Sequence, residues 1–229
     1  MHFGRRLVSL WPAERPLTLD CLPTAPWADV GRLLAELHAV PLEGVLAPST
    51  IPLCTAAERV ADAVARLGAK GDPDTTAVRV AFATLPDWKA ASELPDVRTS
   101  LVHGDWHLGQ VVSLASTARP EWRLIDVDDL GFGDPAWDLA RPAAFFTAGL
   151  LPSEEWETFL SAYRRAGGTA IPPAGDPWRK LDAFARALVV QCAARALEKA
   201  RRASAGLDEN AGAFLSSCRR IAAFGPTLR

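Results

Sequence analysis

Apart from a short strand predicted near the N-terminus over residues 5–11, the β-forming part of this sequence is one short segment near the middle of the chain, with helical patterns on both sides. The apolar pairs Leu101–Val102 and Val111–Val112 and the run Trp122–Val127 are separated by turn-forming residues, which is typical of short strands. Elsewhere, apolar residues recur three and four positions apart, as in helices that bury one face. The sequence therefore predicts an α+β fold that is mostly α, with a small central β-hairpin.

Helices are expected before and after this segment. The first runs from about residue 27 to 40, with His38 on its apolar face, and ends at Pro41. Thr55 and Glu58 match a capping box, so a second helix should begin there and continue to Gly68. A third is expected over 74–91, and later ones over 137–148, 153–165, 177–204 and 209–224.

Composition excludes several kinds of protein. The chain has 25 Lys+Arg and 27 Asp+Glu residues and a net charge of −2, so it offers no basic surface for nucleic acid or an anionic membrane. It has no run of about 18 apolar residues that could span a bilayer, and its N-terminus does not resemble a signal peptide. The four cysteines show no metal-ligand spacing, which indicates free, mostly buried thiols in a reducing cytoplasm. They are Cys21, Cys54, Cys192 and Cys218.

Three polar side chains are expected at one end of the predicted hairpin. Asp105 lies in the loop before the first strand, Gln110 directly precedes that strand, and Asp126 follows the second. Carboxylate and amide oxygens suit Mg²⁺, and a further carboxylate can accept a proton from an attacking hydroxyl. This is the division of labour in kinase phosphoryl transfer. The alternative is that Asp105 and Asp126 are turn and cap residues of an inert hairpin.

Three motifs in this region occur together and in a fixed order. They are residues 103–110 (HGDWHLGQ), 125–129 (IDVDD) and 133–140 (GDPAWDLA). Together they resemble the aminoglycoside phosphotransferase family, which has the protein-kinase-like fold and includes other small-molecule kinases. Residues 31–41 resemble the family's first helix after the hinge. The resemblance therefore covers about residues 5–224 and corresponds to the family's C-terminal lobe.

The resemblance implies an ATP-dependent phosphotransferase that moves the γ-phosphoryl group to a hydroxyl of a small polar molecule, such as a sugar or an aminoglycoside-like compound. It makes Asp105 the catalytic base and places His103 beside it to brace the loop. Asp126 would hold Mg²⁺ on the ATP phosphates, and Gln110 occupies the position that usually holds a metal-binding Asn. The form of residues 107–110 (HLGQ) is similar to that of maltokinase-like members. Asp128 is either a further metal or substrate ligand or part of a solvated turn.

Four other residues are expected to support the fold or border the site. By the resemblance, Asp138 is a buried partner of the catalytic loop and Trp11 lies at the hinge beside the nucleotide. Asp134, before Pro135, is expected to cap a helix. Trp106 is either a core residue or the wall of a sugar site.

The N-terminal lobe with which such kinases cover the nucleotide is largely missing from the expected fold. Before the first helix the sequence has no lysine, and Gly4 is its one glycine, whereas that lobe uses a glycine-rich loop and a strand lysine. We therefore expect residues 1–25 to form a remnant of the last N-lobe strand, around residues 5–11, and the hinge. Residues 26–229 would form the helical lobe.

Three explanations for this gap stay open. The first is that the chain is a truncated product of a longer gene, the second that it is a catalytically impaired pseudokinase that binds a ligand or partner, and the third that a second chain supplies the missing half. In the last case a homodimer or a partner protein would cover the surface that the N-lobe otherwise occupies, because exposed apolar surface favours association.

Overall fold

The computed structural model describes residues 2–3, 6–7, 17, 24–41, 51–68, 71–88, 100–114 and 121–224. All structural statements below concern these residues. They form a mostly helical structure with three small antiparallel sheets, so the prediction of an α+β fold that is mostly α is confirmed.

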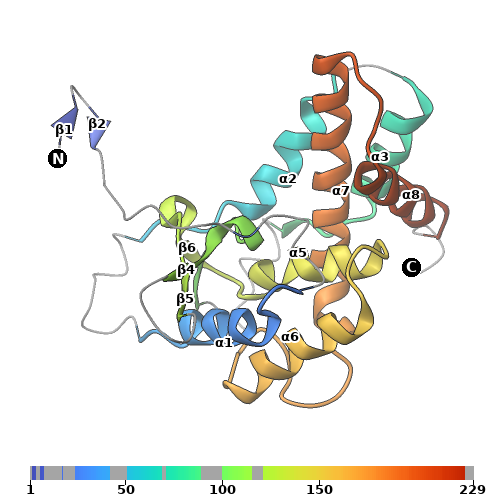
Figure 1. Ribbon diagram of the computed structural model, residues 1–229. Coiled ribbons are helices and arrows are strands. Elements are labelled where there is room, and N and C mark those ends of the chain that lie inside the picture. The colour runs from blue at the N-terminus through green and yellow to red at the C-terminus, as the bar shows by residue number, and fades with distance from the viewer. Residues whose placement is uncertain are drawn as a thin grey trace.

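The long helix α7 (Trp178–Ala203) is the axis of the helical part (Figure 1). Its 26 residues give it a length of about 39 Å. Helices α5 (Ala136–Thr147), α2 (Ala56–Ala65), α8 (Glu209–Phe224) and α3 (Pro73–Ala83) all pack against it. On the other side of α5, helix α1 (Trp27–His38) packs along α6 (Ser153–Arg165).

One apolar core connects these helices. Its largest fully buried side chains include Tyr163 and Phe159 of α6, Leu34 of α1, Leu139 of α5 and Leu181 of α7. The core extends to the β segment through buried Val111. Burial of a large apolar side chain stabilises a fold by about 1.5–3 kcal/mol, so the strands that carry the polar loop are anchored on the helical core.

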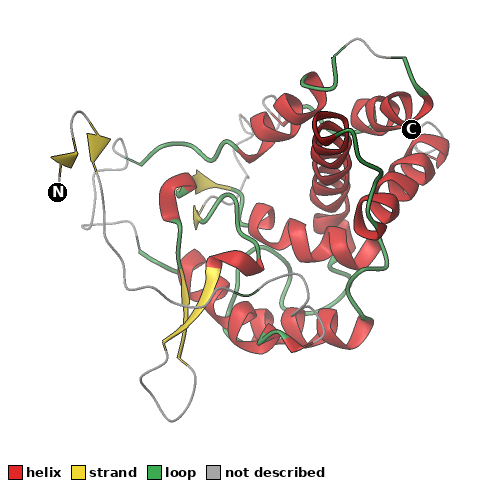
Figure 2. Ribbon diagram, turned by 45° about the horizontal axis from the view of Figure 1, so that its top comes forward, coloured by secondary structure: helices red, strands yellow, loops and turns green. Residues whose placement is uncertain are grey.

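Two of the sheets form the central β segment, seen as yellow arrows beside the helices in Figure 2. Strands β4 (Val111–Leu114) and β5 (Glu121–Leu124) pair with Val111 opposite Leu124, which confirms the predicted hairpin. Strand β3 (Ser100–Val102) pairs with β6 (Gly131–Gly133), a strand that the sequence did not predict. The two sheets place residues 103–110 and 125–130 next to each other.

The end of one helix and the cap of another differ from the prediction. Helix α3 ends at Ala83 rather than near residue 91, and Thr84 and Leu85 form a turn before Pro86, because the residue before a proline disfavours helical geometry. Helix α2 begins after Thr55 as expected, but the capping box does not form. The Thr55 hydroxyl instead accepts a hydrogen bond from the Arg59 guanidinium at 3.0 Å.

Near the N-terminus, strands β1 (His2–Phe3) and β2 (Arg6–Leu7) pair antiparallel. β2 falls within the expected strand over residues 5–11. Residues 8–16, including Trp11, lie outside the described residues, so the hinge and the domain boundary near residue 25 stay predictions. Among the described helices, none combines the length and apolar character needed to cross a membrane.

Candidate active site

A buried carboxylate holds the loop that follows β3. Asp138 is 1% exposed in the first turn of α5. Its Oδ2 accepts the backbone N–H of His103 at 2.7 Å, and its Oδ1 accepts that of Gly104 at 2.9 Å. Charge-assisted hydrogen bonds of this kind are among the stronger ones in proteins. Asp138 therefore has the place expected for a buried partner of the loop, and it fixes the backbone directly before Asp105.

The same carboxylate is joined to a buried chain of side chains. Oδ2 of Asp138 lies 3.0 Å from Nε2 of His38, and Nδ1 of His38 lies 2.7 Å from the Tyr163 hydroxyl. That hydroxyl accepts the Ala170 N–H at 2.9 Å, and burial raises the pKa of Tyr163 above its ordinary value, so it keeps its proton. The tautomer that satisfies this chain has Tyr163 donating to Nδ1 and Nε2–H donating to Asp138. His38 is thus buried as predicted, but it is a polar link and not only a packing residue.

His103 braces two loops from inside the protein. Its side chain is fully buried, and Nε2 lies 2.8 Å from the carbonyl oxygen of Ile125. It therefore joins the start of the catalytic loop to the residue before Asp126. Burial keeps this ring away from any bound substrate, so His103 has the position of a bracing residue.

A glycine is required at position 104, between His103 and Asp105, because the backbone of Asp129 passes close to it. Gly104 has a φ of +85°, and a Cβ atom at this position would lie 2.4 Å from the carbonyl oxygen of Asp129. Any other residue would both adopt an unfavourable φ and push the 127–129 turn away. This glycine therefore keeps the two acidic loops in contact.

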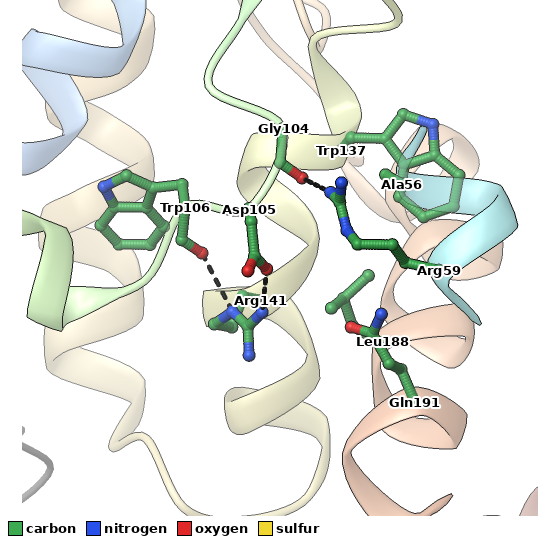
Figure 3. A pocket seen from close by; sticks show the side chains of 9 residues that line it. All are labelled: Ala56, Arg59, Gly104, Asp105, Trp106, Trp137, Arg141, Leu188 and Gln191. Carbon is green, nitrogen blue, oxygen red and sulfur yellow. Dashed lines mark hydrogen bonds and ion pairs between the residues drawn. The ribbon is translucent and has the colours of Figure 1, made fainter. Parts of the chain in front are cut away.

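Asp105 points into a narrow pocket (Figure 3) and is paired with an arginine. Its Oδ1 accepts Nη2 of Arg141 at 2.8 Å, and Nε of the same guanidinium donates to the Trp106 carbonyl at 2.9 Å. The Asp105 side chain is 25% exposed, so its other oxygen can be reached from the pocket. The bond to Arg141 thus fixes the orientation of the Asp105 carboxylate.

Gln110 and Asp126 meet at the open end of the hairpin. Nε2 of Gln110 donates to Oδ2 of Asp126 at 2.6 Å, and the backbone of Ile125 donates to the Gln110 carbonyl at 2.9 Å. Asp126 is exposed and has a φ of +61°, which is unusual for a residue other than glycine. This conformation turns its carboxylate toward Gln110, so the sequence prediction that these two side chains lie together agrees with the geometry.

The donor chemistry at this end fits Mg²⁺. An exposed carboxylate and a side-chain amide lie in contact, and Mg²⁺ is commonly bound by one or two such protein ligands together with waters and phosphates. Asp128 is exposed in the short 3-10 helix η4 (Val127–Asp129), which begins directly after Asp126. Among the described residues, no hydrogen bond joins Asp128 to Gln110 or Asp126. Within the described ranges, no group of three or more His, Cys, Asp and Glu side chains is arranged to hold a metal. The metal roles of Gln110, Asp126 and Asp128 stay predictions.

Two arginines near Asp105 were not predicted from the sequence. Arg59 of α2 donates to Asp129 at 3.0 Å and to the Gly104 carbonyl, and Arg141 pairs with Asp105. A signal for Arg141 exists, because it lies three positions after Asp138 on a predicted helix and so shares a face with it. Arg59 has no comparable signal, since its partners are 45 and 70 positions away.

Of the other predicted residues, Asp134 has the expected capping role: its Oδ1 accepts the N–H of Ala136 at 2.9 Å, and its Oδ2 pairs with Lys180 of α7. Trp106 is 3% exposed and stacks on Phe159. Its ring is therefore packed as a core residue, although Trp106 also lines the pocket around Asp105, so a role in walling an acceptor site stays a prediction.

Comparison with known proteins identifies the family. The sequence model of the Phosphotransferase enzyme family matches residues 6–184, more than three quarters of the chain. The chain belongs to this family. The match includes all three motifs of the site and confirms the resemblance seen in the sequence. No curated protein gives a significant match to this family member.

Solved structures with the same fold show how much of it this phosphotransferase-family chain contains. A choline/ethanolamine kinase family protein from Mesorhizobium loti is 16% identical, with a TM-score of 0.56, and the match covers 92% of this chain and 68% of that one. Choline kinase from Cryptosporidium parvum Iowa II is 11% identical, with a TM-score of 0.62 and coverages of 92% and 68%. A thermostable mutant of aminoglycoside phosphotransferase APH(4)-Ia is 19% identical, with a TM-score of 0.54 and coverages of 93% and 71%.

These likenesses establish the protein-kinase-like fold for this family member. About a third of each of those structures has no counterpart in these 229 residues. This agrees with the prediction of an incomplete N-terminal lobe, in that the lobe is partly missing from these residues.

Proposed function

We propose that this protein is an ATP-dependent phosphotransferase that phosphorylates a hydroxyl group of a small polar molecule. The observation that carries the proposal is the placement of Asp105: the backbone before it is bonded to buried Asp138, and its carboxylate opens into a pocket. The contact between Gln110 and Asp126 supplies the second half of the site.

Asp105 would act as the general base. A substrate hydroxyl that enters the pocket can donate its hydrogen bond to the free oxygen of Asp105, and the carboxylate then accepts the proton as the hydroxyl oxygen attacks the γ-phosphorus. Arg141 keeps the carboxylate in one orientation during this step. Because positioning dominates phosphoryl transfer, the rigid backbone of residues 103–105 contributes directly to the rate.

Gln110 and Asp126 would hold Mg²⁺ and, through it, the phosphates of ATP. The ion would neutralise charge on the β- and γ-phosphate oxygens. In the structure, Nε2 of Gln110 faces Asp126. The amide would turn over so that its oxygen faces the ion, and the two ends of an amide are nearly equal in shape.

The test is Mg²⁺-dependent transfer of ³²P from [γ-³²P]ATP to a panel of small hydroxyl compounds. Asp105→Asn should abolish transfer, whereas calorimetry should show that this variant still binds Mg·ATP. Asp182→Asn is a matched control, because Asp182 is 60% exposed on α7 and is not part of the site. Unchanged turnover in Asp105→Asn would remove Asp105 from the role of base. Failure of the wild-type protein to bind Mg·ATP would contradict the proposed function as a whole.

A further inference from the structure

Two guanidinium groups flank the reacting carboxylate in the pocket of Figure 3. Arg141 enters from α5 and Arg59 from α2, and both side chains are mostly buried, at 16% and 18% exposed. Gln191 of α7 lines the same pocket and is 2% exposed. The polar surface around Asp105 is therefore built from three different helices.

The charge of this surface is unusual for a site that would receive a cation. Among the described residues that line the pocket, Asp105 is the single acid, and one of its oxygens is already bonded to Arg141. Asp129 pairs with Arg59 at 3.0 Å, but it is 44% exposed and does not line the pocket. An ammonium group beside the reacting hydroxyl would lie next to two guanidinium groups and would compete with Arg141 for the one carboxylate that lines the pocket.

Each of the two arginines also has an N–H donor without a strong acceptor among the described residues. Nε of Arg59 is buried and has no hydrogen-bond partner within the described structure, although a buried polar atom normally has one. Nη1 of Arg141 lies 4.0 Å from the sulfur of Cys192, which is a weak acceptor. A guanidinium group has five N–H donors and no acceptor, so a ligand that satisfies these groups must bring oxygen atoms.

We propose that the acceptor is a small hydroxy acid, whose carboxylate binds Arg59 and Arg141 while its hydroxyl meets Asp105. This inference rests on the proposed function and specifies its substrate class. Arginine suits the task because its planar fork binds both oxygens of a carboxylate. The cavity volume of the pocket is about 10 Å³, which is room for about one water molecule, so side chains that line the pocket must move when the acceptor binds.

The reaction then balances as a phosphoryl transfer from ATP. The hydroxyl oxygen of the acid forms a bond to the γ-phosphorus, and the bond between this phosphorus and the β,γ-bridging oxygen breaks. The hydroxyl proton passes to Asp105 and then to solvent. The products are the phosphate monoester of the hydroxy acid and ADP.

The experiment compares acceptors that share a carbon skeleton and differ in charge. The six-carbon set is gluconate, glucose and glucosamine, and the three-carbon set is glycerate, glycerol and 3-amino-1,2-propanediol. Each is tested both as a phosphoryl acceptor with Mg·ATP and for binding, by calorimetry and by the shift in melting temperature. In at least one set, the acid should bind roughly tenfold or more tightly than its neutral and cationic counterparts.

Variants test whether the arginines cause the preference. Arg59→Gln should weaken binding of the preferred acid by about 10- to 100-fold, and Arg59→Lys should restore part of it. Arg202→Gln removes the same charge from a side chain that is 79% exposed and about 16 Å farther along α7 than Gln191, and it should change nothing.

The proposal would be overturned if the acid is the preferred member of neither set, if none of the six compounds binds, or if the acid affinity is unchanged in Arg59→Gln. Binding of an acid without phosphoryl transfer to any acceptor would support the pocket's preference for acids and contradict the phosphotransferase function. The two failures are therefore distinguishable.

Discussion

Asp138 should be the most sensitive single position of the site, and Asp138→Asn tests this directly. The wild-type carboxylate accepts three N–H groups, from His103, Gly104 and His38, at 2.7, 2.9 and 3.0 Å. An asparagine has one oxygen, and the orientation that keeps most bonds places it where Oδ2 lies, so it still accepts from His103 and His38 while its NH₂ group faces the Gly104 N–H. One hydrogen bond to a charged acceptor is lost, and the two that remain have a neutral acceptor, in a place that water does not reach.

The magnitude follows from this loss and from the weakening of the two remaining bonds. A hydrogen bond to a charged group stabilises a protein by about 1.5–3 kcal/mol and a neutral one by about 0.5–1.5 kcal/mol, so the free energy of unfolding should fall by roughly 3–6 kcal/mol. For a domain of this size that corresponds to a decrease in melting temperature of roughly 6–24 °C. Since the whole domain is expected to be stable by about 5–15 kcal/mol, this decrease is a large fraction of the free energy of unfolding.

Urea denaturation and thermal melting followed by circular dichroism measure this change. The control Asp182→Asn removes an exposed i,i+4 pair with Arg186 and should change stability by less than about 0.5 kcal/mol. A second measurement needs no variant: in the wild-type protein, the amide protons of His103 and Gly104 should exchange slowly with solvent. A stability of Asp138→Asn within about 1 kcal/mol of the control would refute the reasoning, as would fast exchange at both amides.

Three further predictions concern other parts of the molecule. Arg141→Met should lower kcat by about 10- to 100-fold, because Asp105 loses its fixed orientation, and should leave the affinity for Mg·ATP unchanged in calorimetry. Gly31→Ala should destabilise the protein by about 1–3 kcal/mol in urea melts, since its Cβ would lie 2.4 Å from a carbonyl oxygen of α6, whereas Gly212→Ala, with nothing within 4 Å, should be neutral or stabilising; equal effects would contradict this packing. Burial raises the pKa of Cys54 to about 11, so the thiol stays protonated at pH 8, and iodoacetamide should label it at least tenfold more slowly in the native than in the urea-unfolded chain, as peptide mass mapping would show.

The hairpin and the meeting of Gln110 with Asp126 were predictable because they depend on short-range pattern. Alternating apolar residues on both sides of a polar turn specify an antiparallel pair, and the register of Val111 opposite Leu124 then places the residues just outside the pair together. The role of Asp138 came from the family resemblance, since nothing in the local sequence says that a helix carboxylate reaches back to a loop 34 positions earlier.

The strand β6 was not predictable, because its three residues carry little β-forming signal. Gly131 and Gly133 are both poor strand formers, and they occur there for lack of space: a Cβ on either would lie within 3.0 Å of atoms of Cys54. The capping box at Thr55 does not form because the Thr55 hydroxyl has another partner. Its hydroxyl is bonded to Arg59, whose side chain is held by Asp129 and the Gly104 carbonyl, so a tertiary contact replaced a local one.

The pocket around Asp105 could not be predicted from the sequence, because most of the residues that line it come from three helices far apart in the chain. The same fact affects which acceptor the pocket can bind. The base and the expected metal ligands lie on two adjacent loops, so their arrangement follows from one hairpin. Arg59, Arg141 and Gln191 come from α2, α5 and α7, and their convergence depends on how α2 and α5 pack on α7. A motif therefore predicts the phosphoryl-transfer chemistry of this protein, whereas the charge that an acceptor meets is set by helix packing. Because these arginines are bonded to the Gly104 carbonyl and to the carboxylate that we propose as the base, a bound acid would also move the loop that carries Asp105, so acceptor preference and turnover should change together in Arg59 variants.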